Sequence, residues 1–253
     1  MSGNRMIIVA GWAHTTEDMA PLCSLLSGKY DIQATSTASL YSTIDPSLDS
    51  LPPASQYARA LYGLISKAGE PPVIVAWSMG ALVAVETIVK LSPRVSRLII
   101  VSGTARFCGS DDYPHGVPEQ NLRAMAANLV KQPDEVLTAF FHDAIFPETD
   151  RGQKVEKKTR KALSLSIECL RDGLSYLRHT DLRRKLSEIQ APTLIIHGKQ
   201  DKIIPVSAGE FLNSNIRNSR LVIHEDEGHT LILDHPALIA EDIGTHPKKS
   251  LES

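Results

Sequence analysis

Residues Ala76-Trp77-Ser78-Met79-Gly80 are the most informative stretch of this chain. An apolar run at residues 72–76 precedes the serine, and a helix-like run at residues 81–85 follows it. A serine at a sharp turn between a strand and a helix projects its hydroxyl away from the backbone, where it can act as a nucleophile. The pattern is G-x-S-x-G with Ala76 in place of the first glycine. The stretch therefore predicts an enzyme that hydrolyses an acyl bond.

Short apolar runs alternate with longer helical patterns along the chain. The runs span residues 6–10, 72–77, 97–102, 193–197 and 220–224, with a weaker candidate at 31–35. The strong runs are nearly continuous in apolar residues, which is typical of strands buried on both faces. Helical patterns lie at residues 54–67, 79–91, 206–213 and 236–243. This alternation predicts an α/β fold with a mostly parallel, doubly wound sheet.

One long segment interrupts the alternation, because no strand-like run appears between residues 118 and 186. Spacings of four and three there predict one apolar helix face, made by Leu163, Ile167, Leu170, Leu174 and Leu177. Shorter helices are predicted at residues 122–130 and 136–141. We therefore expect a core at residues 1–117 and 187–246, a helical cap or lid inserted at 118–186, and a polar tail at 247–253.

Composition excludes several classes of protein. The 253 residues carry a net charge of −2, so nothing global indicates binding to nucleic acid or to a membrane. Cys23, Cys108 and Cys169 are widely spaced and odd in number, which favours neither a disulfide framework nor a zinc site. The apolar run at residues 6–10 is too short for a signal peptide. We expect a soluble cytoplasmic protein that needs no metal and no organic cofactor.

A serine nucleophile needs a histidine to accept its proton and a carboxylate to orient that histidine. In an α/β fold of this kind the order along the chain is Ser, Asp or Glu, then His. Asp201 lies at the apex of a turn after the run at 193–197, and His229 lies on the loop after the run at 220–224. The sequence therefore predicts Ser78, Asp201 and His229 as a catalytic triad.

An oxyanion hole is the remaining requirement, since backbone N–H groups must face the charge that develops on the substrate. One predicted donor is the N–H of Met79, which directly follows the serine at the start of a helix. The second is the N–H of Trp12, in the loop after the first strand, where Gly11 permits a tight turn. The Trp12 indole is also a candidate wall of the acyl pocket.

Structural roles compete with these interpretations. Asp201 could simply cap the helix that follows it. Asp226 is the rival carboxylate, but it lies too close to His229 in sequence to come from a separate loop. Cys108 is either a pocket wall or a bystander. The other histidines considered are more often surface or strand-end residues, with a pocket role left open for the first of them: His14, His197, His224 and His235.

Four motifs in chain order resemble the α/β-hydrolase superfamily. They are Trp12 after a strand and a glycine, Trp77-Ser78-Met79-Gly80, Gly198-x-x-Asp201-x-x-x-Pro205, and Gly228-His229-x-x-x-x-Asp234-x-Pro236. Within the superfamily the chain is most similar to the pimeloyl-ACP methyl ester esterases of biotin synthesis, through residues 172–174, 181–183 and 186–193. Two positions depart from that family's pattern, Ala10 where many relatives have histidine and Ala76 where glycine is usual.

The resemblance implies the triad Ser78, Asp201 and His229, with Trp12 and Met79 as oxyanion donors. It also implies a cap that docks acyl carrier protein. Within the predicted cap, residues 151–161 carry six basic side chains and one acidic one, Glu156. These could form a solvated helix face, or they could steer an acidic carrier protein toward the site. The candidate docking residues are Arg151, Lys154, Lys157, Lys158, Arg160 and Lys161.

The leading hypothesis is a serine carboxylester hydrolase that cleaves the methyl ester of pimeloyl-ACP. A broad hydrolase of small esters or thioesters is the alternative, and a perhydrolase-type relative belongs to the same class. A hydrolase fold retained as a small-molecule receptor is a third hypothesis. Labelling of Ser78 by a fluorophosphonate separates the enzymes from the receptor.

Overall fold

The computed structural model describes residues 4–43 and 45–245, and its centre is a six-stranded parallel sheet. The strand order is β2-β1-β3-β4-β5-β6, and every pair of neighbours is parallel. The strands are β1 (Asn4–Ala10), β2 (Tyr30–Ser36), β3 (Val73–Trp77), β4 (Arg97–Val101), β5 (Thr193–Gly198) and β6 (Ser219–His224). The predicted fold class is therefore confirmed, and the sheet is wholly parallel in this part of the chain.

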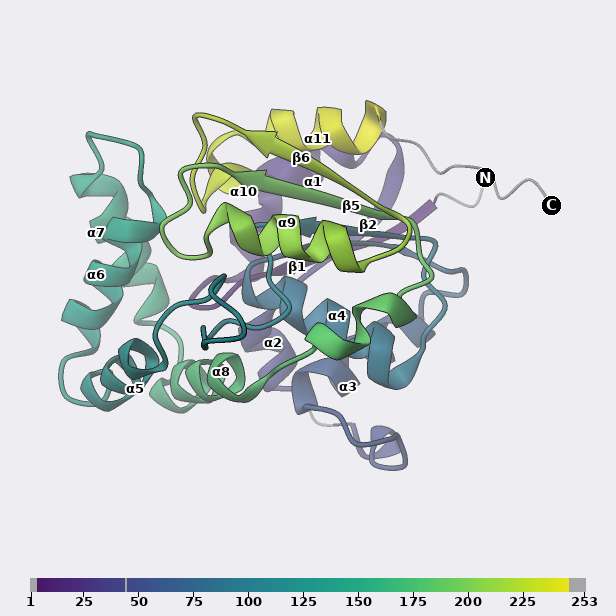
Figure 1. The fold of residues 1–253 in the computed structure, drawn as a ribbon, viewed down its shortest axis with the longest axis horizontal. Coiled ribbons are helices and arrows are strands. Elements are labelled where there is room, and N and C mark those ends of the chain that lie inside the picture. Colours follow the sequence, from purple (N-terminus) through teal and green to yellow (C-terminus); the bar gives the residue numbers. More distant parts are fainter. Residues whose placement is uncertain (1–3, 44, 246–253) are drawn as a thin grey trace.

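Helices cover both faces of the sheet, as Figure 1 shows. One face packs against α1 (Ala20–Leu26), α10 (Leu231–Asp234) and α11 (Pro236–Thr245), and the other against α3 (Gln56–Ser66), α4 (Met79–Leu91) and α9 (Val206–Asn215). Neighbouring residues of β1 consequently enter different cores, Ile7 on the α3–α4 side and Ile8 on the α1–α11 side. Two covered faces explain why the central strands are continuous apolar runs.

Most differences from the sequence prediction concern short elements. The weak candidate at 31–35 is a full strand, β2, and the predicted helix at 79–91 coincides with α4. The prediction did not include α1 or α2 (Thr37–Tyr41). It also did not include the 3₁₀ turns η1 (Thr16–Met19), η2 (Pro46–Leu48) and η3 (Arg183–Glu188). Elements this short carry too few turns for an apolar period to emerge.

Four helices lie between β4 and β5, on the left side of Figure 1, and are called the cap helices below. They are α5 (Glu119–Asn128), α6 (Pro133–Ala144), α7 (Gly152–Ala162) and α8 (Ile167–His179). The predicted single apolar face from Leu163 to Leu177 is wrong at its start. Leu163 lies at the end of α7 and is exposed, and α8 begins after Ser166, whose hydroxyl accepts a hydrogen bond from the Cys169 N–H.

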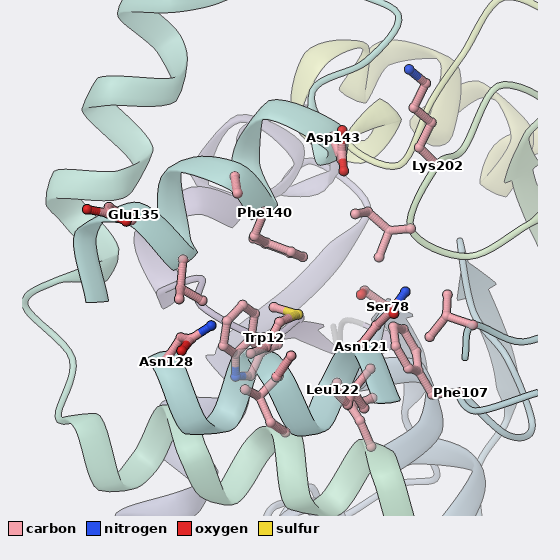
Figure 2. Close-up of a pocket in the computed structure, with 18 of the residues that line it drawn as sticks. Trp12, Ser78, Phe107, Asn121, Leu122, Asn128, Glu135, Phe140, Asp143 and Lys202 are labelled. Atoms are coloured by element: carbon pink, nitrogen blue, oxygen red, sulfur yellow. The ribbon is translucent and has the colours of Figure 1, made fainter. Parts of the chain in front are cut away.

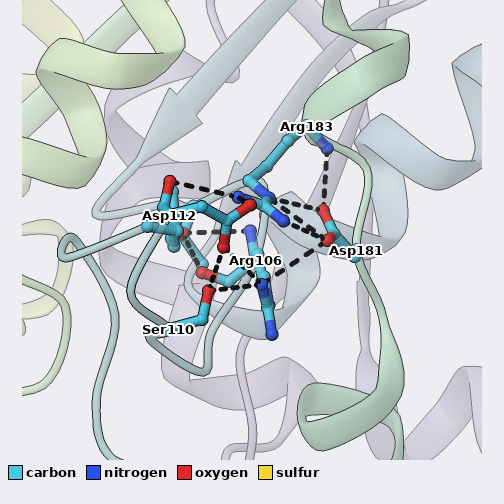
Figure 3. Close-up of polar contacts among 7 residues, drawn as sticks. Arg106, Ser110, Asp112, Asp181 and Arg183 are labelled. Carbon is cyan, nitrogen blue, oxygen red and sulfur yellow. Dashed lines mark hydrogen bonds and ion pairs between the residues drawn. The ribbon is translucent and has the colours of Figure 1, made fainter.

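A cluster of ion pairs joins the two ends of this insertion (Figure 3). Arg183 contacts Asp181 at 2.8 Å and Asp112 at 3.0 Å, and Arg106 lies 2.8 Å from the Ser110 hydroxyl. The backbone closes the same gap, because the Leu182 N–H donates to the carbonyl of Ala105 at 2.9 Å. The chain therefore leaves the core after β4 and returns to it at almost the same point.

Within residues 4–43 and 45–245, no helix is long and apolar enough to cross a membrane. The same residues contain no group of three or more His, Cys, Asp or Glu side chains placed to hold a metal ion. The predicted polar tail at 247–253 lies outside the described residues.

Candidate active site

Ser78 occupies a strained turn between the end of β3 and the start of α4. Its φ of 57° and ψ of −124° are rare for a residue with a side chain, and only a surrounding structure that fixes the backbone can hold them. Part of that support comes from the Ser78 N–H, which donates to the Val101 carbonyl at 3.0 Å. Gly80 allows α4 to approach β1, since a Cβ there would lie 2.6 Å from the Val9 carbonyl oxygen.

The two small residues that flank Ser78 have different roles, which gives a first prediction. Ala76 is fully buried in β3, so its methyl group fits without displacing the turn. Ala76→Gly should keep full esterase activity and lose about 1 kcal/mol of unfolding free energy, because glycine gains more backbone freedom on unfolding. Gly80→Ala should cost more stability, because its Cβ meets backbone. Thermal unfolding and turnover of a p-nitrophenyl ester measure both; a larger loss from Ala76→Gly would contradict the assignment.

The three side chains predicted as a triad form one hydrogen-bonded line. The Ser78 Oγ lies 2.9 Å from His229 Nε2, and His229 Nδ1 lies 2.8 Å from Asp201 Oδ2. All three residues are buried, with exposed fractions of 7%, 1% and 8% in the order Ser78, His229, Asp201. The imidazole is thus placed to accept the serine proton at Nε2 while Asp201 fixes its tautomer through Nδ1–H.

Asp201 is held by more than His229. Its Oδ1 accepts the N–H groups of Ile203 and Ile204, both at 2.8 Å, so the carboxylate also caps the following turn. Burial would raise the pKa of Asp201, but the histidines His229 and His197 and the hydrogen bonds to them hold it below its ordinary value. The carboxylate is therefore ionised at neutral pH, the state required to stabilise an imidazolium.

His197 is a neighbour of Asp201 that the sequence did not reveal. It is fully buried in β5 rather than at a strand end facing solvent, and its Nε2 lies 2.9 Å from the Ile204 carbonyl and 3.5 Å from Asp201 Oδ2. The carbonyl can only accept, so Nε2 carries the proton. His197 therefore ties together the strand and the turn that present Asp201.

The rival residues lie elsewhere. Asp226 is exposed, and the hydrogen bonds of the His229 ring among the described residues go to Ser78 and Asp201. His224 contacts Asp242 at 2.8 Å, and His235 contacts Glu227 at 2.6 Å. These two histidines serve as partners of carboxylates away from the triad.

The loop after β1 lies directly beside Ser78. A Cβ at Gly11 would lie 2.8 Å from the Ser78 Cβ and 3.3 Å from its Oγ, so only glycine fits there. The next residue, Trp12, donates its indole N–H to the Leu170 carbonyl on α8 at 2.9 Å. Met79 begins α4, where the first backbone N–H groups have no partner within the helix. Both predicted oxyanion donors therefore belong to backbone segments next to Ser78.

A cavity of about 530 Å³ opens above Ser78 (Figure 2). Its inner wall is apolar and includes Trp12, Phe140, Leu174 and Leu177, from the core and from the cap helices. Figure 2 shows exposed polar side chains around it, among them Asn121, Asn128, Glu135, Asp143 and Lys202. Two residues considered for the pocket are not in its wall, because Cys108 is buried in the core and His14 is buried against Trp77 and Phe141. The volume lies within the range usual for sites that bind small molecules.

Most of the basic segment forms α7. Four of its six basic side chains contact a described side chain, and two form no ion pair within the described residues. Lys154 pairs with Asp234 at 2.7 Å and with Glu148, and Lys161 pairs with Asp18 at 3.0 Å. Arg160 pairs with its neighbour Glu156, and Arg151 lies 3.0 Å from His142 Nε2. Lys157 and Lys158 form no ion pair within the described residues, and Lys158 is half-buried. None of the six residues lines the cavity above Ser78.

Comparison with known proteins agrees with this geometry. The family described as alpha/beta hydrolase fold matches residues 57–236. A pimeloyl-[acyl-carrier protein] methyl ester esterase of Nitrosomonas europaea is 26% identical over 239 residues, which cover 93% of this chain and 92% of that protein. A protein of the same name from Xylella fastidiosa is 29% identical over 241 residues, which cover 92% and 91%.

Solved structures share the fold. An esterase from Exiguobacterium antarcticum superposes with a TM-score of 0.81 at 21% identity, covering 97% of this chain and 92% of that chain. A bromoperoxidase from Bacillus anthracis superposes with a TM-score of 0.84 at 18% identity, covering 96% and 91%. The chain therefore belongs to the α/β-hydrolase family. Within that family it is a carboxylic ester hydrolase.

Proposed function

We propose that this esterase removes the methyl group from the methyl ester of pimeloyl-acyl carrier protein, through an acyl-enzyme on Ser78. The observation that carries the mechanism is the hydrogen-bonded line Ser78–His229–Asp201 at the floor of the cavity. The substrate rests on the similarity to two esterases of that name along more than nine-tenths of the chain. The cavity adds support, because it is apolar within and carries exposed amides at its rim.

The mechanism has two halves. Ser78 Oγ attacks the ester carbonyl while His229 Nε2 takes its proton, and the carbonyl oxygen becomes an oxyanion beside the N–H groups of Trp12 and Met79. The tetrahedral adduct collapses, and the imidazolium returns the proton to the departing methoxide, which leaves as methanol. Water then attacks the acyl-enzyme while His229 accepts its proton. The second adduct collapses, the carboxylic acid leaves, and His229 returns the proton to Ser78.

The arrangement of the cavity fits a carried acyl chain. The methyl ester lies at the end of the chain far from the carrier, so the ester must reach Ser78 while the carrier stays outside. Trp12 and Phe140 pack edge to face with ring centroids 4.9 Å apart and offer the chain an apolar wall. At the rim, the side-chain amides of Asn121, Asn128 and Gln132 can hydrogen-bond to the amides of the carrier's prosthetic arm.

Two experiments test this function. The purified enzyme should release methanol from the pimeloyl-acyl carrier protein methyl ester, as followed by mass spectrometry of the carrier. The gene should also restore growth of a biotin-requiring bacterial strain that lacks its own methyl ester esterase. Good activity on p-nitrophenyl esters or on small thioesters, with failure in both experiments, would favour the alternative of a broad ester or thioester hydrolase.

The proposal includes docking of the carrier protein on α7. The ion pairs of this helix reduce the number of basic side chains that are free to contact the carrier. Lys154 and Lys161 face acids of the core, which leaves Lys157 and Arg160 as exposed cations on that helix. The Arg160 partner, Glu156, is itself 68% exposed, so this pair is a weak one that an acidic carrier can replace. Lys158 and Arg151, which are less exposed, add positive charge to the same segment.

Charge reversal tests the docking surface. Lys157→Glu with Arg160→Glu should lower kcat/KM for the carrier-bound substrate about tenfold at low salt, because electrostatic steering raises association rates. The same variant should hydrolyse a p-nitrophenyl ester at the normal rate. Steady-state kinetics on both substrates make the comparison, and equal losses on the two would reject α7 as the docking site.

A further inference from the structure

Asp18 connects the loop after β1 with helix α7, a segment that is distant from this loop in sequence. Asp18 lies in η1, just after the loop that contains Trp12, a predicted oxyanion donor, and its side chain is 13% exposed. Its Oδ1 accepts a hydrogen bond from Lys161 Nζ on α7 at 3.0 Å. Its Oδ2 accepts the Thr15 N–H at 2.9 Å and lies 3.2 Å from His14 Nδ1. One carboxylate therefore holds the loop and a cap helix together.

The loop requires such support. Ala13 has a φ of 59°, a backbone conformation that costs energy for any residue with a side chain. Gly11, two residues earlier, stands against Ser78 with no space for a Cβ. A shift of this loop would therefore change the distance between its N–H groups and the position of the oxyanion, where catalysis is most sensitive to geometry.

His14 extends the contact toward the triad. Burial lowers the pKa of His14 to about 4, so the imidazole is neutral at pH 7 and donates its Nδ1–H to Asp18. Its ring packs against Trp77 at 4.5 Å and against Phe141 of α6 at 5.4 Å between centroids. Trp77 in turn donates its indole N–H to the His229 carbonyl at 2.9 Å.

We propose that Asp18 is a positioning residue for the oxyanion hole, and that Lys161 makes its position depend on the cap. The proposal rests on the esterase function proposed above. Asp18 fixes the loop from Gly11 to Thr15 through the Thr15 N–H and His14, and Lys161 fixes Asp18 from α7. The cap thus supports the reaction from a side that does not touch the substrate, since neither Asp18 nor Lys161 lines the cavity.

Kinetics of a small p-nitrophenyl ester give the first test. Asp18→Asn should lower kcat by about 10- to 100-fold and leave KM nearly unchanged, somewhat less than the loss of a whole oxyanion donor. Lys161→Met should lower kcat about two- to fivefold, the size expected for one partly exposed ion pair. Lys131→Met is the control, because it removes an exposed lysine between α5 and α6 that is neither a candidate docking residue nor part of the cavity wall, and it should leave kcat unchanged.

Binding of a trifluoromethyl ketone separates positioning from folding. This inhibitor forms a tetrahedral oxyanion on the nucleophilic serine, so its Kd, measured by calorimetry, should rise in Asp18→Asn by the factor that kcat/KM falls. A purely structural defect would reduce the fraction of competent protein without changing Kd. Unchanged Kd in Asp18→Asn, or equal effects of Lys161→Met and Lys131→Met, would overturn the inference. A wild-type protein that binds the ketone but hydrolyses no ester would instead overturn the proposed function.

Discussion

Replacement of Ser78 by alanine is expected to lower kcat for a p-nitrophenyl ester by about 10⁶-fold, the scale seen when a serine hydrolase loses its nucleophile. The hydroxyl is the group that forms the acyl-enzyme, and no neighbouring side chain in the cavity wall replaces it. The variant should also lose all labelling by a fluorophosphonate. Initial rates and gel fluorescence measure the two effects.

A matched control is available on the adjacent strand. Ser102 follows β4 as Ser78 follows β3, and it is also buried with a positive φ, 44°. Its hydroxyl has no hydrogen-bond partner among the described residues. Ser102→Ala should therefore keep both turnover and labelling. Loss of labelling in this variant, with labelling retained in Ser78→Ala, would show that the nucleophile is a different serine.

The second large effect is expected at Asp201. Asp201→Asn should lower kcat by about 10⁴-fold, because an amide can hold His229 in the wrong tautomer and cannot stabilise the imidazolium. The hydrogen bonds to the N–H groups of Ile203 and Ile204 remain possible for asparagine, so the turn should survive. Initial rates, together with thermal unfolding to confirm the fold, make the measurement.

Asp226→Asn is the comparison for this prediction. Asp226 lies three residues before His229 and is exposed, so its charge is screened by solvent. Its replacement should change kcat by less than about twofold. If Asp226→Asn removed activity and Asp201→Asn did not, the assignment of the triad carboxylate would have to be reversed.

The sequence predicted the sheet well because buried parallel strands are recognisable without any partner. Each central strand is a short run of Ile, Leu and Val, and α4 begins and ends where its apolar pattern does. The order Ser78, Asp201, His229 was likewise readable, since each residue follows a predicted strand. In the structure the His229 ring lies between the other two side chains, 2.9 Å from Ser78 Oγ and 2.8 Å from Asp201 Oδ2.

The contacts that the sequence did not predict join residues that are distant along the chain or on different elements. The charge count of residues 151–161 is correct, but Lys161 and Lys154 meet Asp18 and Asp234, acids that no local pattern connects with them. His197 similarly acquires its place only when β5 and the turn after it fold together. A signal for Asp18 did exist in the sequence, because Thr15 and Asp18 have the spacing of a capping box.

The break after Leu163 shows a limit of periodicity itself. The apolar spacing of four residues continues from Leu163 to Ile167, although the helix is interrupted there. Apolar spacing reports which side chains are buried and contains no information on backbone hydrogen bonds. Ser166 marks the true start of α8, since its hydroxyl accepts the Cys169 N–H. A search for capping serines within long periodic runs would have divided this helix correctly.

The ion pairs of Arg106, Asp112, Asp181 and Arg183 have a consequence for how such enzymes diversify. These ion pairs and the hydrogen bond from the Leu182 N–H to the Ala105 carbonyl hold the two ends of the insertion next to each other. An inserted segment whose two ends lie next to each other can be replaced by another segment without moving the strands on either side of it. Selection can then vary the side chains that the cap helices supply to the cavity wall while the strand before Ser78 keeps its place in the sheet.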